Sequence, residues 1–210
     1  MIYFIIIMRK QLILITVLIF LSALLFSLEG IKFQGGLTAT FHGSESSAQM
    51  AIKPGGGLSF PIKLGGNLIL EPALYISTLN VEEQNAVVVP VEVEQSDVLL
   101  LQFFVMAHIG VAFEILKLHQ FTVMGSLAFI PSLPIAESSG TSMDAVFAYY
   151  YSSLRFIYPG IKLGYAWKFS ENKSLVIDMT GLFPISNIWT GENIVNYLMV
   201  IASIGFLIHI

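Results

Sequence analysis

The stretch at residues 31–42, IKFQGGLTATFH, alternates between two kinds of side chain. Its odd positions are apolar or glycine, namely Ile31, Phe33, Gly35, Leu37, Ala39 and Phe41, and its even positions include Lys32, Gln34, Thr38, Thr40 and His42. A period of two residues is typical of a β-strand, because successive side chains point to opposite faces. The apolar face is too continuous and too aromatic to face water, so the stretch predicts a strand beside lipid.

The same parity recurs in seven further stretches. Their proposed lipid faces use even positions 50–64, even 68–78, odd 99–115, odd 121–129, odd 161–169, odd 175–183 and even 198–210, with Thr78 as the one polar exception. The opposite faces mix small residues with charges, as a narrow polar lumen requires. A soluble sandwich would instead turn its apolar face inward and its charges toward water. We therefore expect an all-β fold, an eight-stranded antiparallel up-and-down transmembrane β-barrel.

The connections between these stretches support a barrel. Tight links at 64–67, 116–120 and 170–173 alternate with longer ones at 42–49, 78–96, 131–158 and 184–196. Outer-membrane barrels alternate short periplasmic turns with longer external loops in this way. Residues 91–94 keep the parity of the fourth strand, and residues 149–156 continue upstream of the sixth, so we expect both segments to protrude as extracellular ribbons.

A helical membrane protein is the rival interpretation, with spans at 12–28, 98–113 and 197–210. The last two runs are shorter than the roughly 20 residues that a spanning helix needs, and they are rich in glycine, aromatic and β-branched residues. Strand formation is therefore the better prediction for both.

The composition and the N-terminus indicate an envelope protein. The chain of 210 residues is 55% hydrophobic, only 11% charged and free of cysteine. Arg9 and Lys10 precede an apolar run that ends near Ser27 and Gly30, which is the layout of a secretory signal peptide. We expect a signal peptide at 1–29, with Met8 as a possible true start, and a barrel domain at 30–210. An uncleaved membrane anchor is the alternative.

The C-terminal strand, with Ala202, Ile204, Phe206, Ile208 and Ile210 in alternation, and the stretch PGIKLGYAWKF at 159–169 resemble strands of small outer-membrane proteins of the OmpX, OmpW and OmpA-transmembrane kind. The resemblance covers about residues 30–210 and is one of pattern. It implies an outer-membrane location, in contact with membrane lipids, and recognition of the last strand by the barrel assembly machinery. The chain ends in isoleucine, whereas that family usually ends in Phe or Trp.

Two groups of residues are candidates for the functional parts of such a barrel. The lumen-lining polar network would comprise Lys32, Lys53, Lys63, Glu71, Gln102, His108, Glu114, Lys162, Lys168 and Asp178. Because unpaired charge in a narrow lumen is costly, we expect ion pairs across it. The aromatic girdles at the lipid boundaries would comprise Phe41, Phe121, Phe129, Trp167, Phe169 and Phe183.

The sequence favours a structural or surface-exposed platform that serves adhesion or envelope integrity, with acidic extracellular loops open to an external ligand. A narrow channel for small solutes is the alternative, since the same residues would line it. A lipid-modifying enzyme is a remote third possibility that would rest on His42, Ser44 and Glu45. We expect a monomer with no enzyme activity and no cofactor or metal. We also expect no nucleic-acid binding, because the acidic loops would repel polyanions.

Overall fold

The computed structural model describes residues 28–43, 48–84, 87–91, 98–137, 143–152, 154–191 and 195–210. The expected signal peptide lies outside them except for its last two residues. The strands are β1 (Gly30–Gly43), β2 (Ala48–Ser59), β3 (Ile62–Gly65), β4 (Leu68–Gln84), β5 (Val87–Val91), β6 (Val98–Ile115), β7 (His119–Phe129), β8 (Ser132–Glu137), β9 (Ile157–Ser170), β10 (Lys173–Leu182) and β11 (Leu198–His209). The helices are α2 (Met143–Ser152) and α3 (Asn187–Thr190).

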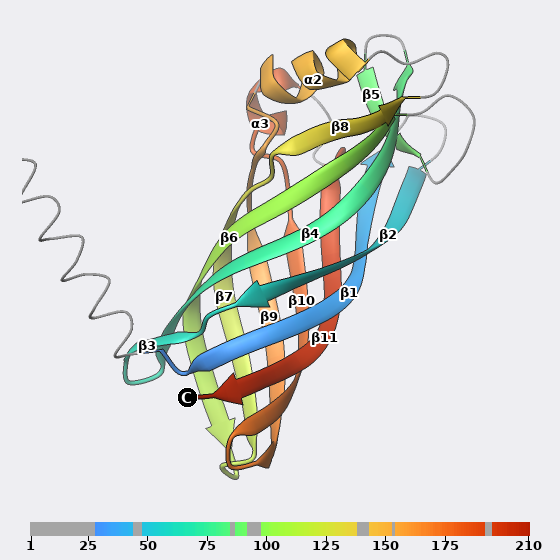
Figure 1. Cartoon of the computed structure of the whole chain (residues 1–210). Coiled ribbons are helices and arrows are strands. Elements are labelled where there is room, and N and C mark those ends of the chain that lie inside the picture. The colour runs from blue at the N-terminus through green and yellow to red at the C-terminus, as the bar shows by residue number, and fades with distance from the viewer. Residues whose placement is uncertain are drawn as a thin grey trace, which may run out of the picture.

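These strands close into a ring (Figure 1). The eight positions around the ring are β1, then β2 continued by β3, then β4, then β6, then β7 continued by β8, then β9, β10 and β11. Every neighbouring pair is antiparallel, and β11 pairs with β1 to close the ring. The predicted eight-stranded antiparallel barrel is confirmed.

The burial of side chains follows the predicted parity over most of the ring, but near the tight turns the inward-facing Lys63, Glu114 and Lys168 are exposed as well. Exposed side chains on the outer face alternate with buried ones inside, for example Leu127, Leu163 and Phe206 against Ser126, Lys162 and Leu207. Ile62 is an exception, because it lies on the predicted lipid parity but is only 4% exposed. There the short β3 is joined by a bridge to Leu28, which breaks the alternation.

The two ends of the barrel differ. Three tight turns, at residues 66–67, 116–118 and 171–172, lie at the end that also carries the C-terminus, and we call it the turn end. Gly66, Leu116 and Lys117 have φ values of 54°, 55° and 57°, which tight reversals require. The opposite loop end carries α2, α3, β5 and β8 (Figure 1).

The expected extracellular ribbon at 149–156 is wrong, because residues 143–152 form helix α2. Among the side chains of α2 that the structure describes, Val146 and Tyr150 are buried. They are four residues apart, so they share both one face of a helix and one face of a strand. Parity alone could not separate the two structures. Strand β5, which pairs with β4, and strand β8, which pairs with β6, extend the loop end. Of the ribbon expected at 91–94, only Val91 is described, as the last residue of β5.

The runs at 98–113 and 197–210, which the rival interpretation made helical, belong largely to β6 and β11. In the part of the chain that the structure describes, no helix combines the length and the apolar character that a membrane crossing needs.

The closure between β1 and β11 generates a prediction about glycine. A Cβ atom at inward-facing Gly36 would lie 2.1 Å from the carbonyl oxygen of Ala202, whereas one at outward-facing Gly35 would meet nothing closer than 3.9 Å. We expect Gly36→Ala to lower the free energy of unfolding by about 1–3 kcal/mol, as overpacking does, and Gly35→Ala to leave it unchanged or slightly higher. Urea titration followed by heat-modifiable gel migration measures both, and equal effects would contradict the proposed close approach.

Candidate functional site: the barrel interior

Four charged residues from opposite sides of the ring meet inside the barrel. Lys32 of β1 lies 2.9 Å from Glu71 Oε1 on β4 and 3.0 Å from Asp178 Oδ2 on β10. Lys162 of β9 lies 2.7 Å and 3.1 Å from the same two oxygens. Each ammonium thus contacts both carboxylates, and the formal charges of this ion-pair quartet cancel.

The quartet is buried, because none of its side chains is more than 7% exposed. Removing charges from water is costly, and only close pairing and further hydrogen bonds offset that cost. Ser59 Oγ supplies one such bond by donating to Glu71 Oε1 at 2.5 Å. Gly164 makes room for the quartet, since a Cβ there would lie 2.6 Å from Asp178 Oδ1.

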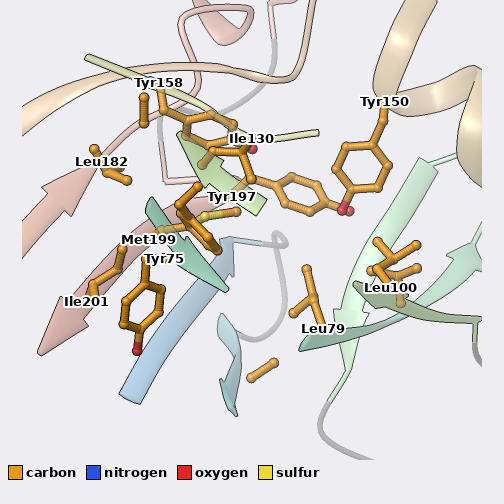
Figure 2. Packing of buried hydrophobic residues seen from close by; sticks show 14 of the residues in the cluster. Tyr75, Leu79, Leu100, Ile130, Tyr150, Tyr158, Leu182, Tyr197, Met199 and Ile201 are labelled. Atoms are coloured by element: carbon orange, nitrogen blue, oxygen red, sulfur yellow. The ribbon is translucent and has the colours of Figure 1, made fainter. Parts of the chain in front are cut away.

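Apolar and aromatic side chains fill the interior between the quartet and the loop end (Figure 2). Tyr75 and Phe104 make an edge contact, with ring centroids 5.8 Å apart. Val146 and Tyr150 of α2 belong to the same buried cluster, which we call the aromatic plug: Ala51, Ala73, Tyr75, Leu79, Val81, Val88, Val98, Leu100, Phe104, Met106, Ala128, Ile130, Val146, Tyr150, Tyr158, Leu182, Tyr197, Met199 and Ile201. This half of the barrel is therefore less polar than expected, although inward polar residues such as Thr38, Ser77 and Gln102 are buried there too.

Tyr197 joins the plug to the loops. Its hydroxyl donates to the carbonyl oxygen of Val88 on β5, and its ring packs edge-on against His42 with centroids 6.0 Å apart. Nearby, Asn187 Nδ2 donates to the carbonyl oxygen of Asn196 at 2.8 Å. Burial raises the pKa of Tyr150 and of Tyr197, so both phenols stay neutral well into the alkaline range. Two buried, neutral phenols thus lie at the loop end, where the Tyr197 hydroxyl is hydrogen-bonded to β5.

The turn end is open. A vestibule of about 670 Å³ is lined there by charged side chains that include Glu29, Lys63, Glu114, Lys168 and Glu171. Burial raises the pKa of the Glu29 carboxyl, and the neighbouring Lys63 opposes that rise. A separate cavity of about 20 Å³, room for about one water molecule, touches Glu29 as well as Lys32, Glu71 and Asp178 of the quartet. The vestibule is therefore blind, because the quartet and the plug lie beyond it.

The structure gathers only part of the expected lumen network. Lys32, Glu71, Lys162 and Asp178 form the quartet. Gln102 Nε2 donates to Ser132 Oγ at 3.2 Å, and His108 Nδ1 lies 2.7 Å from Ser126 Oγ, so both take part in separate buried pairs. Lys63, Glu114 and Lys168 are exposed at the vestibule, and Lys53 is half-buried on β2.

The expected girdle residues all lie on the outer parity. Phe121, Trp167 and Phe169 are exposed toward the turn end, and Phe129 is exposed toward the loop end. Phe41 and Phe183 are half-buried at the loop end. The plug was missed, although Tyr75, Phe104 and Tyr158 stand on the inward parity of their strands, and that position was the signal that could have revealed it.

The structure does not bring together, within the residues that it describes, the catalytic set His42, Ser44 and Glu45 on which an enzyme would rest. His42 is buried against Tyr197, and Ser44 and Glu45 lie outside the described residues. Within the described ranges, no three or more His, Cys, Asp or Glu side chains are grouped so that they could hold a metal ion.

No protein-family model matches the chain, and no curated protein matches it. Among solved structures it is similar to Neisserial surface protein A, with 12% identity and a TM-score of 0.51, over 87% of this chain and 99% of that one. It is also similar to Ail, the attachment invasion locus protein of Yersinia pestis, with 10% identity and a TM-score of 0.44, over 87% of this chain and 99% of that one. A de novo designed transmembrane β-barrel is similar with 11% identity and a TM-score of 0.42, over 87% of this chain and 97% of that one. The chain thus has the fold of the small eight-stranded outer-membrane β-barrels, and the resemblance to that class is confirmed.

The quartet predicts an asymmetry between two lysines on β9. Lys162→Met leaves two buried carboxylates with one cation, so we expect the free energy of unfolding to fall by about 3–5 kcal/mol. Lys168→Met, on the same inward parity but exposed, should change it by less than about 0.5 kcal/mol. Urea unfolding of the barrel in detergent micelles compares the two, and a similar loss for both variants would remove the quartet from the account of stability.

Proposed function

We propose that this protein is an outer-membrane β-barrel of a Gram-negative-type envelope, in which a sealed, rigid barrel presents the loop end at the cell surface and serves adhesion or envelope integrity. The observation that carries the proposal is the combination of an apolar outer wall with an interior filled by the quartet and the aromatic plug. A barrel of this kind is suited to hold loops in place.

The orientation follows from the two ends. Outer-membrane barrels place tight turns in the periplasm and longer connections outside the cell, so the turn end and the vestibule face the periplasm. The loop end then faces outward and presents acidic side chains such as the exposed Asp144 of α2. Several other acidic residues of the long connections, Glu45, Glu92, Glu94, Asp97 and Glu192, lie outside the described residues. Neisserial surface protein A is, by its name, a surface protein, which supports the same placement.

A non-enzymatic role fits this proposal, since the compared natural barrels are described as surface and attachment proteins. The same proposal includes secretion by a signal peptide, recognition of the last strand by the assembly machinery, contact with membrane lipids and a monomeric state. It also includes an external ligand that binds the loops. The channel alternative lacks support, because the plug lies across the route.

Labelling with a thiol reagent tests the location and the orientation together. The chain has no cysteine, so Asp144→Cys on α2 and Glu171→Cys in the last tight turn each introduce one exposed thiol. A membrane-impermeant maleimide should label Asp144→Cys in intact cells and Glu171→Cys only after the outer membrane is permeabilised. Equal labelling in intact cells, or labelling of the turn alone, would contradict the proposal.

Planar-bilayer recordings test the sealed lumen. We expect no stable single-channel current from the folded wild-type protein, because buried side chains occupy the lumen from the quartet to the loop end. Insertion is checked on the same sample by heat-modifiable gel migration. A reproducible current that Lys162→Met alters would favour the channel over the platform.

A further inference from the structure

A chain of aromatic contacts leads from the outer wall of the barrel onto α2. Phe129, at the end of β7, lies 5.0 Å from Phe156 between ring centroids, Phe156 lies 5.6 Å from Tyr151, and Tyr151 lies 4.4 Å from Phe147. We call Phe129, Phe156, Tyr151 and Phe147 the aromatic ladder. Phe129 is 46% exposed and Phe147 is 48% exposed, so the ladder has open rings at both ends.

Helix α2 has two different apolar faces. Val146 and Tyr150 are buried in the aromatic plug. Phe147 and Tyr151 each follow by one residue, which rotates them by about 100° around the helix axis. Tyr151 still packs against the plug and also continues the ladder, whereas Phe147 is 48% exposed, so the plug does not account for Phe147.

The surface beside the ladder is also apolar. Leu133 and Ile135 of β8 are exposed, and so is Leu154, which follows α2. Leu133 pairs in register with Leu101 of β6, whose odd positions form the outer wall of the barrel. The apolar wall therefore continues past the end of β7 at this point of the rim.

We infer that the ladder side of α2 lies in the outer leaflet of the membrane and that its partner is the lipid surface, with Phe147 at the boundary between headgroups and acyl chains. This inference rests on the proposed outer-membrane location. The ring contacts of the ladder connect Phe147 without a break to Phe129 on the outer wall. Aromatic side chains are also the residues that the membrane interface favours.

Lipid contact on this side would fix the orientation of α2. The plug holds one face of the helix over the barrel, and the leaflet holds the adjacent face against the rim. Asp144, in the first turn, is exposed and charged. It lies one turn before Phe147 and only about 60° from it around the helix axis, so the first turn of α2 would have to stand at headgroup level or above for this carboxylate to stay in water.

Tryptophan quenching by brominated lipids tests the inference on the full chain. The two native tryptophans, Trp167 and Trp189, are replaced by phenylalanine, and single tryptophans are then introduced as Phe147→Trp, Ala148→Trp or Phe129→Trp. Ala148 is the matched control, because it is exposed on the next position of the same helix. Each folded variant is reconstituted into vesicles whose phosphatidylcholine carries bromine on the acyl chains.

We expect quenching of Phe147→Trp to approach that of Phe129→Trp and to exceed that of Ala148→Trp at least about twofold, because only the first two side chains would reach the acyl region. If Phe129→Trp is quenched but Phe147→Trp is quenched no more than Ala148→Trp, the inference is overturned and the barrel proposal stands. That pattern would also be the result if a second copy or a protein partner covered the ladder. If Phe129→Trp itself escapes quenching in folded protein, the proposed membrane location is wrong and the inference falls with it.

Discussion

Closure of the sheet is the constraint on which the rest of this structure depends. Lipid offers no hydrogen-bond partners, so a sheet can cross it only when no strand edge is left open. The pairing of β1 with β11, from Gly30–His209 to Phe41–Leu198, removes the last edge. The two strands approach so closely that glycine is needed on the inner side at Gly36 and Gly205. Closure also brings β1, β4, β9 and β10 to opposite sides of one lumen, which is the condition for the quartet.

A ring of eight strands leaves an interior that side chains must fill. This barrel fills it in two ways, with charges that cancel in pairs and with a plug of tyrosines and apolar residues. Buried ion pairs are weak evidence for net stability, since their desolvation cost can exceed the attraction between the charges. The quartet does specify the register, because a slip of one residue in any of its strands would move a charged side chain to the outer face. Its contacts are compatible with one arrangement of the four strands.

Period-two alternation was enough to predict the strands of the ring, their outward faces and the tight turns. Successive residues of a strand point alternately to the lipid side and to the interior, so each position carries an apolar or a mixed side chain accordingly. It could not predict how far the charged residues reach. Lys162 and Lys168 share one face of β9, yet one is buried in the quartet and the other is exposed at the vestibule. The depth of a residue along the barrel axis determines whether its side chain is buried or exposed. That depth depends on the tilt and stagger of the strands. Parity could not predict α2 either, because the four-residue spacing of its buried Val146 and Tyr150 is compatible with both a helix and a strand.

The difference between the two ends has a functional consequence. The vestibule at the turn end does not reach the quartet, which borders only the small separate cavity. In the quartet, Glu71 and Asp178 already accept hydrogen bonds from two lysines. Beyond the quartet, Tyr75, Phe104 and Tyr197 occupy the lumen and offer few polar groups to a hydrated solute. A through-route would require the plug and α2 to move together, because Tyr150 belongs to both. The plug therefore ties α2 to the barrel wall through Val146 and Tyr150, and the proposed role as a platform depends on that attachment.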